Sequence, residues 1–492
     1  MIKEKLLMIK ERRKMKREKL INYLRTELRS STTHGLPYIV NTEIHWLERA
    51  YWLMNFVICL IIAIMLLTTQ YVRFLNSPVV MSVEMDYFNW NVSYPAITLC
   101  PTGKINQELF SALLKCETRL RTGKTLYSYF WSVATASLDT IDKLALQNSE
   151  TVKLFQNSFQ LISPNEYAGL AGLLFENFEN RTVMTKTNWP VTVHAVLTEM
   201  GMCHVINSNV AAFHDPFKWK DETIAYVKNN IELSAHDIDF FTQIINYADE
   251  YKVYVHSPDE IALSTTPSYT FDTEGYVYFG YRVWTAKISD TLRHVPVSIR
   301  KCRYLDEPLT KRYPVYSYNH CLVECRIRMI QTLCGCVPHF YKPLDHEKIC
   351  DLYELRCVLQ HKNEIIRLSV TNDTLHKHGN VSSLPRTSRD CDCPSDCESH
   401  VYLKDAESIL LQIDMNRLRI GISRFPKVRV TREFIFSTQD MILKTGGVIN
   451  LCIGSSVISI LELILTAMRI PISNLTEWAF EKINKLRERK KK

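Results

Sequence analysis

Two long stretches with almost no charge constrain this chain more than any other feature. From Ala50 to Val72 there are 23 residues without a charged side chain, and from Thr445 to Met468 there are 24 residues with only one, Glu462. At about 1.5 Å of rise per residue, a helix over either stretch would cross the roughly 30 Å hydrocarbon core of a bilayer. The sequence therefore predicts two transmembrane helices, at 50–72 and 445–468.

The charges outside these stretches indicate how the chain is oriented. The formal net charge is +8: residues 1–49 carry +6, residues 469–492 carry +5, residues 73–444 carry −2, and Glu462 carries −1. Positive charge concentrates on the cytoplasmic side of membrane proteins. We therefore expect both tails in the cytoplasm, a 372-residue extracellular loop and a place in the plasma membrane. This distribution argues against nucleic acid as a partner and leaves the basic N-terminal tail as either a solvated helix or a segment that lies on anionic membrane lipid.

The loop between the spans has features of the secretory pathway. It contains 13 of the 15 cysteines, and the other two, Cys59 and Cys452, lie in the predicted spans. The first span starts too far into the chain and is too long for a cleaved signal peptide, so we expect a signal anchor. Asn-x-Ser/Thr sequons predict glycosylation of the loop at Asn91, Asn180, Asn372 and Asn380. A fifth sequon, Asn474, lies in the predicted cytoplasmic tail and should stay unmodified.

Ten cysteines between Cys302 and Cys397 predict a disulfide ladder. Cys321 and Cys325 would lie about 6 Å apart along one face of a helix, and Cys391 and Cys393 about 6.6 Å apart along an extended segment. Because these two spacings are nearly equal, two parallel disulfides, the rungs of the ladder, could join the helix to the extended segment. Spacing alone leaves the connectivity open. Nested pairing gives the set Cys302–Cys397, Cys321–Cys393, Cys325–Cys391, Cys334–Cys357 and Cys336–Cys350.

The remaining loop cysteines are Cys100, Cys116 and Cys203. We expect Cys100–Cys203, which leaves Cys116 either buried or bridged to another chain. A zinc site is the rival interpretation of the cysteine-rich region, but the Cys-x2-Cys spacing is missing and an oxidising compartment favours disulfides. No metal site, cofactor or catalytic motif is expected, so we do not expect an enzyme.

The second apolar stretch contains more polar groups than a lipid anchor needs. It includes Gly446-Gly447, Asn450, Gly454-Ser455-Ser456 and Glu462. Small residues could form a helix-packing face. Alternatively, Gly-Ser-Ser could leave helical geometry, which is tolerated at membrane depth only where the backbone is buried or lines water. Glu462 must face water, a partner or the cytoplasmic interface, because a buried charge there is costly. We favour a segment that lines a pore.

Four segments of the chain resemble the degenerin/epithelial sodium channel family, and the similarity is greatest to its insect pickpocket-type subunits. They occur in the family's order, between and beside the two predicted spans. They are Thr33-His34-Gly35-Leu36, Tyr94-Pro95-Ala96-Ile97-Thr98-Leu99-Cys100, the run from Arg300 to Glu307 with the cysteines after it, and the run from Gly454 to Leu463.

The resemblance implies a two-pass α-helical membrane protein with a large disulfide-rich α+β extracellular domain, assembled as a homotrimer or as a heterotrimer with other family subunits. A β-sheet palm and a helical thumb (about residues 302–397) are expected. Gly454, Ser455 and Ser456 would form a selectivity filter whose ringed oxygens replace part of the hydration shell of the permeant Na⁺. Asn450 would face the pore and Glu462 would attract cations. His34 and Gly35 would fold back under the filter and take part in gating.

Several positions depart from the family pattern. Leu443 stands where members often have a small residue important for gating. Asn450 stands where members commonly have a glycine or serine that contacts amiloride, so the resemblance does not predict block by that drug. Leu465 replaces an aspartate, and there is no histidine pair after the first span, so proton gating is not supported.

These observations predict a pore-forming subunit of a sodium-selective or cation-selective, non-voltage-gated channel with a sensory role. Its extracellular domain would respond to an unidentified chemical ligand or mechanical stimulus. The alternatives are a two-pass scavenger-receptor-like binding protein, which needs no Gly-x-Ser and Glu in its second span, and an ATP-gated trimeric cation channel, for which we find no convincing set of paired lysines.

Overall fold

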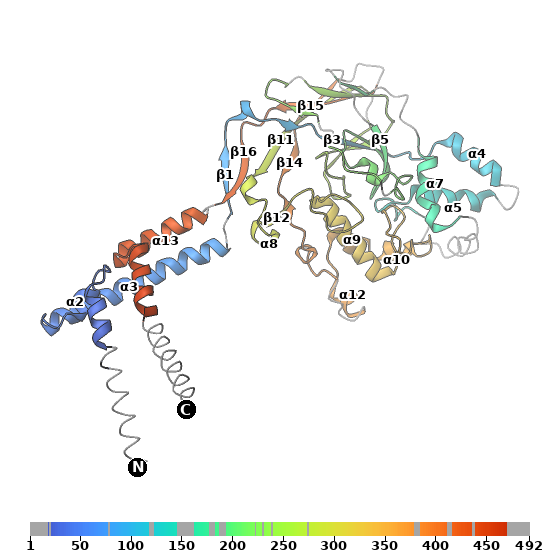
Figure 1. Ribbon diagram of the computed structural model, residues 1–492. Helices are drawn as coiled ribbons and strands as arrows, with labels where there is room; N and C mark the ends of the chain where they lie inside the picture. The colour runs from blue at the N-terminus through green and yellow to red at the C-terminus, as the bar shows by residue number, and fades with distance from the viewer. Residues whose placement is uncertain are drawn as a thin grey trace, which may run out of the picture. The chain divides into compact units, whose positions relative to one another are not determined.

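The computed structural model of the chain divides into two compact units (Figure 1). The terminal unit combines Met1–Val80 with Phe434–Lys492, and the central unit is Met81–Glu433. The structure describes residues 18, 21–76, 79–117, 123–144, 162–176, 183–185, 193–221, 223–228, 231–237, 240–272, 275–377, 384–410, 416–434 and 438–469.

The terminal unit is helical. It contains α2 (Leu36–Val40), α3 (Trp46–Asn76), α13 (Thr438–Ile453) and a further helix at Val457–Arg469. α3 extends four residues beyond each end of the predicted span at 50–72, because no glycine or proline interrupts the turns that flank the apolar run. The predicted span at 445–468 is not one helix: its two halves meet at an angle of 75°.

Within the described residues, one helix is long and apolar enough to cross a membrane, Trp46–Leu75. The bent pair Gln439–Ile453 and Val457–Arg469 has the length and composition of a second span if it is counted as one broken segment. Apolar side chains of α3 point outward, for example Ile61 and Met65. This outward apolar surface is what a lipid-facing helix presents, as expected for the predicted span at 50–72.

The central unit is built around two sheets. The larger sheet has the order β1 (Val79–Glu84), β16 (Arg429–Phe434), β11 (Tyr276–Ile288), β15 (Arg417–Arg424), β8 (Phe241–Ile245) and β4 (Val183–Thr185), and β14 (Ser399–Leu410) pairs with β11. β11 is antiparallel to β14 along one edge and parallel to β15 and then β16 along the other (Figure 1). Its alternating aromatic and β-branched residues favour this long central strand.

The second sheet has five strands. Its order is β10 (Ser268–Phe271), β9 (Tyr251–His256), β3 (Ala96–Pro101), β6 (Gly201–Ile206) and β5 (Val193–Thr198). Short pairs are formed by β2 (Val92–Ser93) with β7 (Glu232–Leu233) and by β12 (Cys302–Arg303) with β13 (Ser395–Asp396). A buried aromatic core contains residues of both larger sheets, such as Leu99, Phe279 and Tyr281. There the Tyr94 hydroxyl donates to Thr242 Oγ1 over 2.8 Å.

Helices and short turns surround the sheets. α9 (Tyr318–Cys334) is the longest helix of the central unit; Ser317 caps its start by accepting from the His320 N–H, and Gly335 ends it with φ of 73°. The other helices among the described residues of this unit are α4 (Gln107–Glu117), α5 (Gly123–Thr135), α7 (Tyr167–Leu174), α8 (Val297–Arg300), α10 (Leu355–Gln360), α11 (Lys362–Arg367) and α12 (Asn372–Lys377). The 3-10 turns are η1 (Tyr87–Asn89), η3 (Pro164–Glu166), η4 (Ala211–His214), η5 (Asp290–Leu292) and η6 (Ser388–Cys391).

Six disulfides lie among the described residues of the central unit, and they are the predicted pair Cys100–Cys203 and the five predicted nested pairs. One joins β3 to β6 and five lie between Cys302 and Cys397: Cys100–Cys203, Cys302–Cys397, Cys321–Cys393, Cys325–Cys391, Cys334–Cys357 and Cys336–Cys350. The expected extended segment at Cys391–Cys393 is wrong. Cys391 ends η6, which Thr387 and Asp390 stabilise through a capping box, and Asp392 follows with φ of 49°. The left-handed residue thus presents the two sulfurs to α9.

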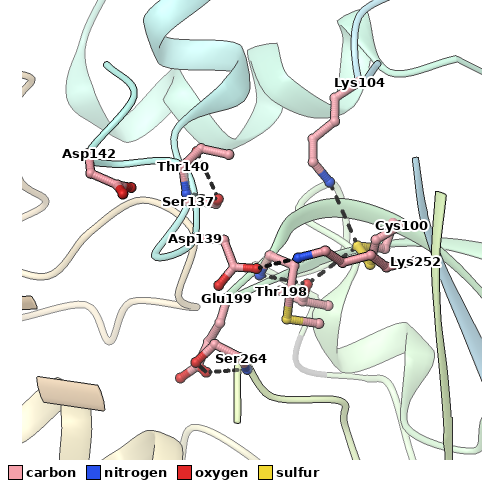
Figure 2. A network of polar contacts seen from close by, with 12 residues as sticks. Cys100, Lys104, Ser137, Asp139, Thr140, Asp142, Thr198, Glu199, Lys252 and Ser264 are labelled. Atoms are coloured by element: carbon pink, nitrogen blue, oxygen red, sulfur yellow. Dashed lines mark hydrogen bonds and ion pairs between the residues drawn. A yellow bond between two sulfur atoms is a disulfide. The ribbon is translucent and has the colours of Figure 1, made fainter. Parts of the chain in front are cut away.

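A buried polar network connects α9 to the β5–β6 turn. Glu199 in that turn forms an ion pair with Arg326 of α9, and both side chains are 1% exposed. The same carboxylate accepts from the backbone and hydroxyl of Ser264 over 3.0 Å (Figure 2). It also accepts from Tyr341 Oη over 2.9 Å. Its charge is therefore fully compensated in the interior, which a buried carboxylate requires.

Candidate functional site

The break in the last helical segment begins at Gly454. This residue has φ of +64°, and its N–H donates to Asn450 O over 2.8 Å. A Cβ at this position would overlap the imidazole of His34. Glycine is therefore required twice, once for the left-handed backbone and once for the close approach of another segment.

The helix restarts through a pair of serines. The Ser459 N–H donates to Ser456 Oγ over 3.2 Å, and the Ser456 N–H donates to Ser459 Oγ over 3.3 Å. This reciprocal arrangement has the pattern of a capping box, in which two otherwise unpaired N–H groups at a helix start are satisfied. The local sequence thus encodes both the end of one helix and the start of the next.

Residues 31–35 pack against this break. The His34 N–H donates to Ile453 O over 3.2 Å, at the last residue of α13. Ser455 Oγ donates to Thr33 Oγ1 over 3.0 Å, and Thr32 Oγ1 lies 2.7 Å from Ser459 Oγ. Thr33, Ser455 and Ser459 are buried. The structure therefore brings a segment more than 400 residues away in the sequence onto the Gly-Ser-Ser break.

Gly35 turns the chain away from the break. It has φ of +90° and is followed by Leu36-Pro37, the start of α2. A Cβ on Gly35 would lie 3.4 Å from Cδ2 of Phe56 on α3. The His-Gly pair thus occupies a narrow space between the break on one side and α3 on the other.

Glu462 lies on the helix after the break and faces the same segment. Its Oε2 accepts from Thr32 Oγ1 at 3.1 Å, and its side chain is partly exposed. A hydroxyl partner compensates the charge only in part, so the carboxylate can still attract a cation.

The side chains of two other predicted site residues of the terminal unit take no part in these contacts at the helix break. Leu443 and Asn450 are exposed on α13, and Leu443 keeps 72% of its accessible surface. Asn450 takes part through its carbonyl, which accepts from Gly454. The free thiols of Cys59 and Cys452 are partly buried.

Sequence reasoning missed Thr32, Thr33 and Ser459 as members of the site. The signal for the first two was the run Ser31-Thr32-Thr33 directly before His34-Gly35. The signal for Ser459 was its spacing of three residues from Ser456, which is the spacing of a capping box.

The predicted glycosylation sites and the unassigned cysteine can be placed only in part. Asn91 and Asn372 are exposed on the central unit. Asn180, Asn380 and the side chain of Cys116 lie outside the described residues. Within the part of the chain that the structure describes, no group of three or more His, Cys, Asp or Glu side chains could hold a metal ion.

A long apolar helix, a broken apolar helix and a large disulfide-rich β domain are together typical of one class, membrane proteins with a large folded domain outside the membrane-spanning helices. The family described as amiloride-sensitive sodium channel matches residues 28–466. The chain belongs to this family, the degenerin/epithelial sodium channels, whose members are multimeric cation channels of the plasma membrane.

Relatives of established name cover most of the chain. Pickpocket protein 28 of Drosophila melanogaster is 22% identical over 493 residues, which are 89% of this chain and 76% of the relative. The sodium channel protein Nach of Drosophila melanogaster is 20% identical over 88% of this chain and 85% of its own length. The bile acid-sensitive ion channel of Mus musculus is 22% identical, also over 88% and 85%.

Proposed function

We propose that this chain is a pore-forming subunit of a sodium-selective or cation-selective channel that is not gated by voltage. Three copies, or this chain with other family subunits, would surround the pore in the plasma membrane, with both termini cytoplasmic. The permeant ion would be Na⁺, and no cofactor is needed.

The break at Gly454-Ser455-Ser456 is the observation that carries this proposal. Inside a membrane, non-helical backbone is tolerated only where it is buried in protein or lines water. Here the hydroxyls of Ser455 and Ser456 have partners within the chain, namely Thr33 and Ser459. We infer that the side chains hold the break in shape, while the backbone carbonyls freed by the missing helical turn face the ion.

The segment at 31–35 supports a link between gating and the filter. It is tied to the break by the contacts of Thr32, Thr33 and His34, so displacement of this segment would remove the support of Ser455. Signals from the extracellular domain would reach the break through the chain that joins β1 to α3 and β16 to α13. The stimulus itself would be a chemical ligand or a mechanical force.

A voltage-clamp experiment tests the filter. In cells that express this chain, alone or with family subunits, Ser456→Phe should abolish the inward current or lower the Na⁺/K⁺ permeability ratio by about tenfold, equivalent to about 1.4 kcal/mol. Ser456→Thr is the matched control, because it keeps the hydroxyl that caps the following helix. Equal selectivity of native and Ser456→Phe channels at equal surface expression would refute the filter assignment.

A further inference from the structure

A cavity of about 660 Å³ lies in the central unit where α8, β12, the start of α9 and the residues of η6 and after it meet. One of its walls contains Cys393, whose disulfide to Cys321 fixes that wall to α9. Small-molecule sites in proteins usually measure about 300–1,000 Å³ and combine apolar walls with a few converging polar groups. The cavity therefore has the size of a site for an organic molecule and is too large for a single inorganic ion to fill.

The charged side chains on its walls are mostly cationic. Lys301, Arg303 and Arg389 line the cavity, and among the described residues that do so Asp392 is the only carboxylate. Lys301 and Arg389 are exposed to solvent, and Arg303 is half-buried. The walls thus carry two more positive charges than negative ones.

The three cations have no ion-pair partner among the described residues. Other arginines of the same segment do: Arg293 pairs with Asp306, and Arg300 pairs with Glu307. The carboxylates that lie nearest in the sequence are therefore already engaged. The positive charge at the cavity stays available to a ligand of opposite charge.

Two of the cations are held in place by neutral groups. Nη1 of Arg303 donates to Glu307 O over 3.1 Å, and its Cζ lies 5.4 Å from the centre of the Tyr316 ring. Lys301 caps α8 with φ of 56°, and its N–H donates to Val297 O over 2.7 Å. A carbonyl and an aromatic ring restrict the guanidinium without cancelling its charge, so little ordering is left for a ligand to induce.

Apolar side chains lie on the same walls as the cations. Leu309 and Tyr318 line the cavity, and each keeps 41% of its surface exposed. Val297 and Pro394 add further apolar surface. Exposed apolar surface beside unpaired cations suits a molecule that is itself apolar at one end and negatively charged at the other.

We propose that this cavity binds a small organic anion, in which a carboxylate or a similar oxyanionic group is attached to an apolar body. Lys301, Arg303 and Arg389 attract the oxyanionic group, and Leu309 and Tyr318 contact the apolar body. A metal ion or an organic ammonium is excluded as occupant by the sign of the charge. Binding itself is independent of the proposed channel function, on which only an effect of the ligand on current would rest.

Calorimetry on the full-length protein in nanodiscs of zwitterionic lipid tests binding without measuring current. The probe is 2-naphthoate, its uncharged isostere 2-naphthamide is the reference ligand, and the heats with empty nanodiscs are subtracted. We expect the carboxylate to bind at least about tenfold more tightly than the amide at low salt, and to lose affinity as the salt concentration rises. Equal affinity for the two ligands would overturn the proposal.

Variants of the two exposed cations locate the binding site. Lys301→Gln and Arg389→Gln should each weaken 2-naphthoate binding severalfold, because each removes one of the three attracting charges. Lys311→Gln is the matched control, since Lys311 is an exposed lysine of the same segment that does not line the cavity. An equal loss of affinity in all three variants would contradict binding at this cavity.

Asp392→Asn keeps the test decisive if a cation variant does not fold. Asp392 has φ of 49°, a conformation that asparagine also adopts readily, so this variant should fold. Because it removes the only carboxylate of the described walls, 2-naphthoate should bind a few-fold more tightly. An unchanged or lower affinity in the folded variant would contradict the proposal.

Competition with inorganic sulfate tests the apolar part of the site. At equal concentrations, sulfate should displace little 2-naphthoate, because it cannot use the contacts with Leu309 and Tyr318. Displacement of most of the 2-naphthoate would show that the cavity takes a bare ion and would overturn the proposed apolar body.

Discussion

Gly454 is the residue on which the site depends most. It combines a positive φ with direct contact to His34, and each demand excludes a side chain. Gly446, eight residues earlier on α13, has neither constraint: a Cβ there meets no atom within 4 Å. Two glycines that look alike in the sequence therefore differ in what the structure requires of them.

These two glycines give a matched pair of variants. Gly454→Ala should displace His34 and the segment around it, and should reduce the current severalfold or change its gating, because the added methyl group has no space. Gly446→Ala should leave the current nearly unchanged. Whole-cell current normalised to surface expression measures both, and equal currents from both variants would contradict the packing described.

Lys104 is a second residue whose role only the structure reveals. It is buried beside the Cys100–Cys203 disulfide, with its Nζ 3.9 Å from Cys203 Sγ (Figure 2). The same Nζ donates to Met202 O over 2.8 Å. Burial lowers the pKa of Lys104 from 10.5 to about 7, although Asp139 nearby opposes the shift. Between these two pH values the unfolded chain binds more protons at this residue than the folded chain.

The pH dependence of stability follows from this difference. Because the folded pKa is the lower one, the contribution of Lys104 to stability should increase as the pH rises from 7 to 9. Lys104→Met should flatten that increase, whereas Lys287→Met, at an exposed position on β11, should not. Thermal unfolding of the purified protein at pH 7, 8 and 9 measures this, and parallel curves for native and Lys104→Met would exclude the predicted linkage.

At the scale of the element, several disulfides and buried ion pairs hold α9 in the central unit. Disulfides join it to η6 and to Cys393, and Arg326 joins it to the β5–β6 turn. On the same helix Glu324 accepts from Arg312 over 3.0 Å, and Arg312 also binds Glu347. Removing one partner of such a buried pair typically costs about 3–5 kcal/mol, so these contacts fix the position of the helix.

The disulfides of α9 should be needed for the protein to reach the cell surface. Cys321→Ser and Cys391→Ser each break one rung and should reduce surface delivery, because a disulfide of this kind contributes about 2–4 kcal/mol. Cys59→Ser is the control, since Cys59 is a free thiol on α3. Surface biotinylation measures delivery, and normal delivery of both rung variants would argue that the ladder is dispensable.

At the scale of the whole molecule, the predicted topology can be tested by glycosylation. Asn91 and Asn372 are exposed on the central unit, which we expect outside the cell. Asn91→Gln and Asn372→Gln should therefore each remove one glycan, visible as a mobility shift that glycosidase treatment abolishes. Asn474→Gln should produce no shift, because a cytoplasmic tail is not glycosylated. A glycan on Asn474 would reverse the proposed orientation of the C-terminal tail.

Much of the architecture could be predicted because it follows from local composition. The apolar length of 50–72 predicted a helix, which the structure contains, and Gly454 of the family pattern lies at the break between the last two helices. The cysteine spacing led to the nested pairs, although the backbone at Cys391 differs from the expected strand. The mixed pairing of β11, with one antiparallel and two parallel partners, could not be predicted, because register depends on contacts between segments far apart in the chain.

The sequence by itself determined the two apolar stretches, the charge difference between tails and loop, and the glycine that allows the helix to break. These are local properties, set by transfer free energy and by backbone sterics. Only the tertiary structure decided that Thr33 meets Ser455 and that Arg326 is buried against Glu199. Such partners are chosen by three-dimensional proximity and by the need to satisfy each buried polar group, and neither can be derived from spacing along one chain.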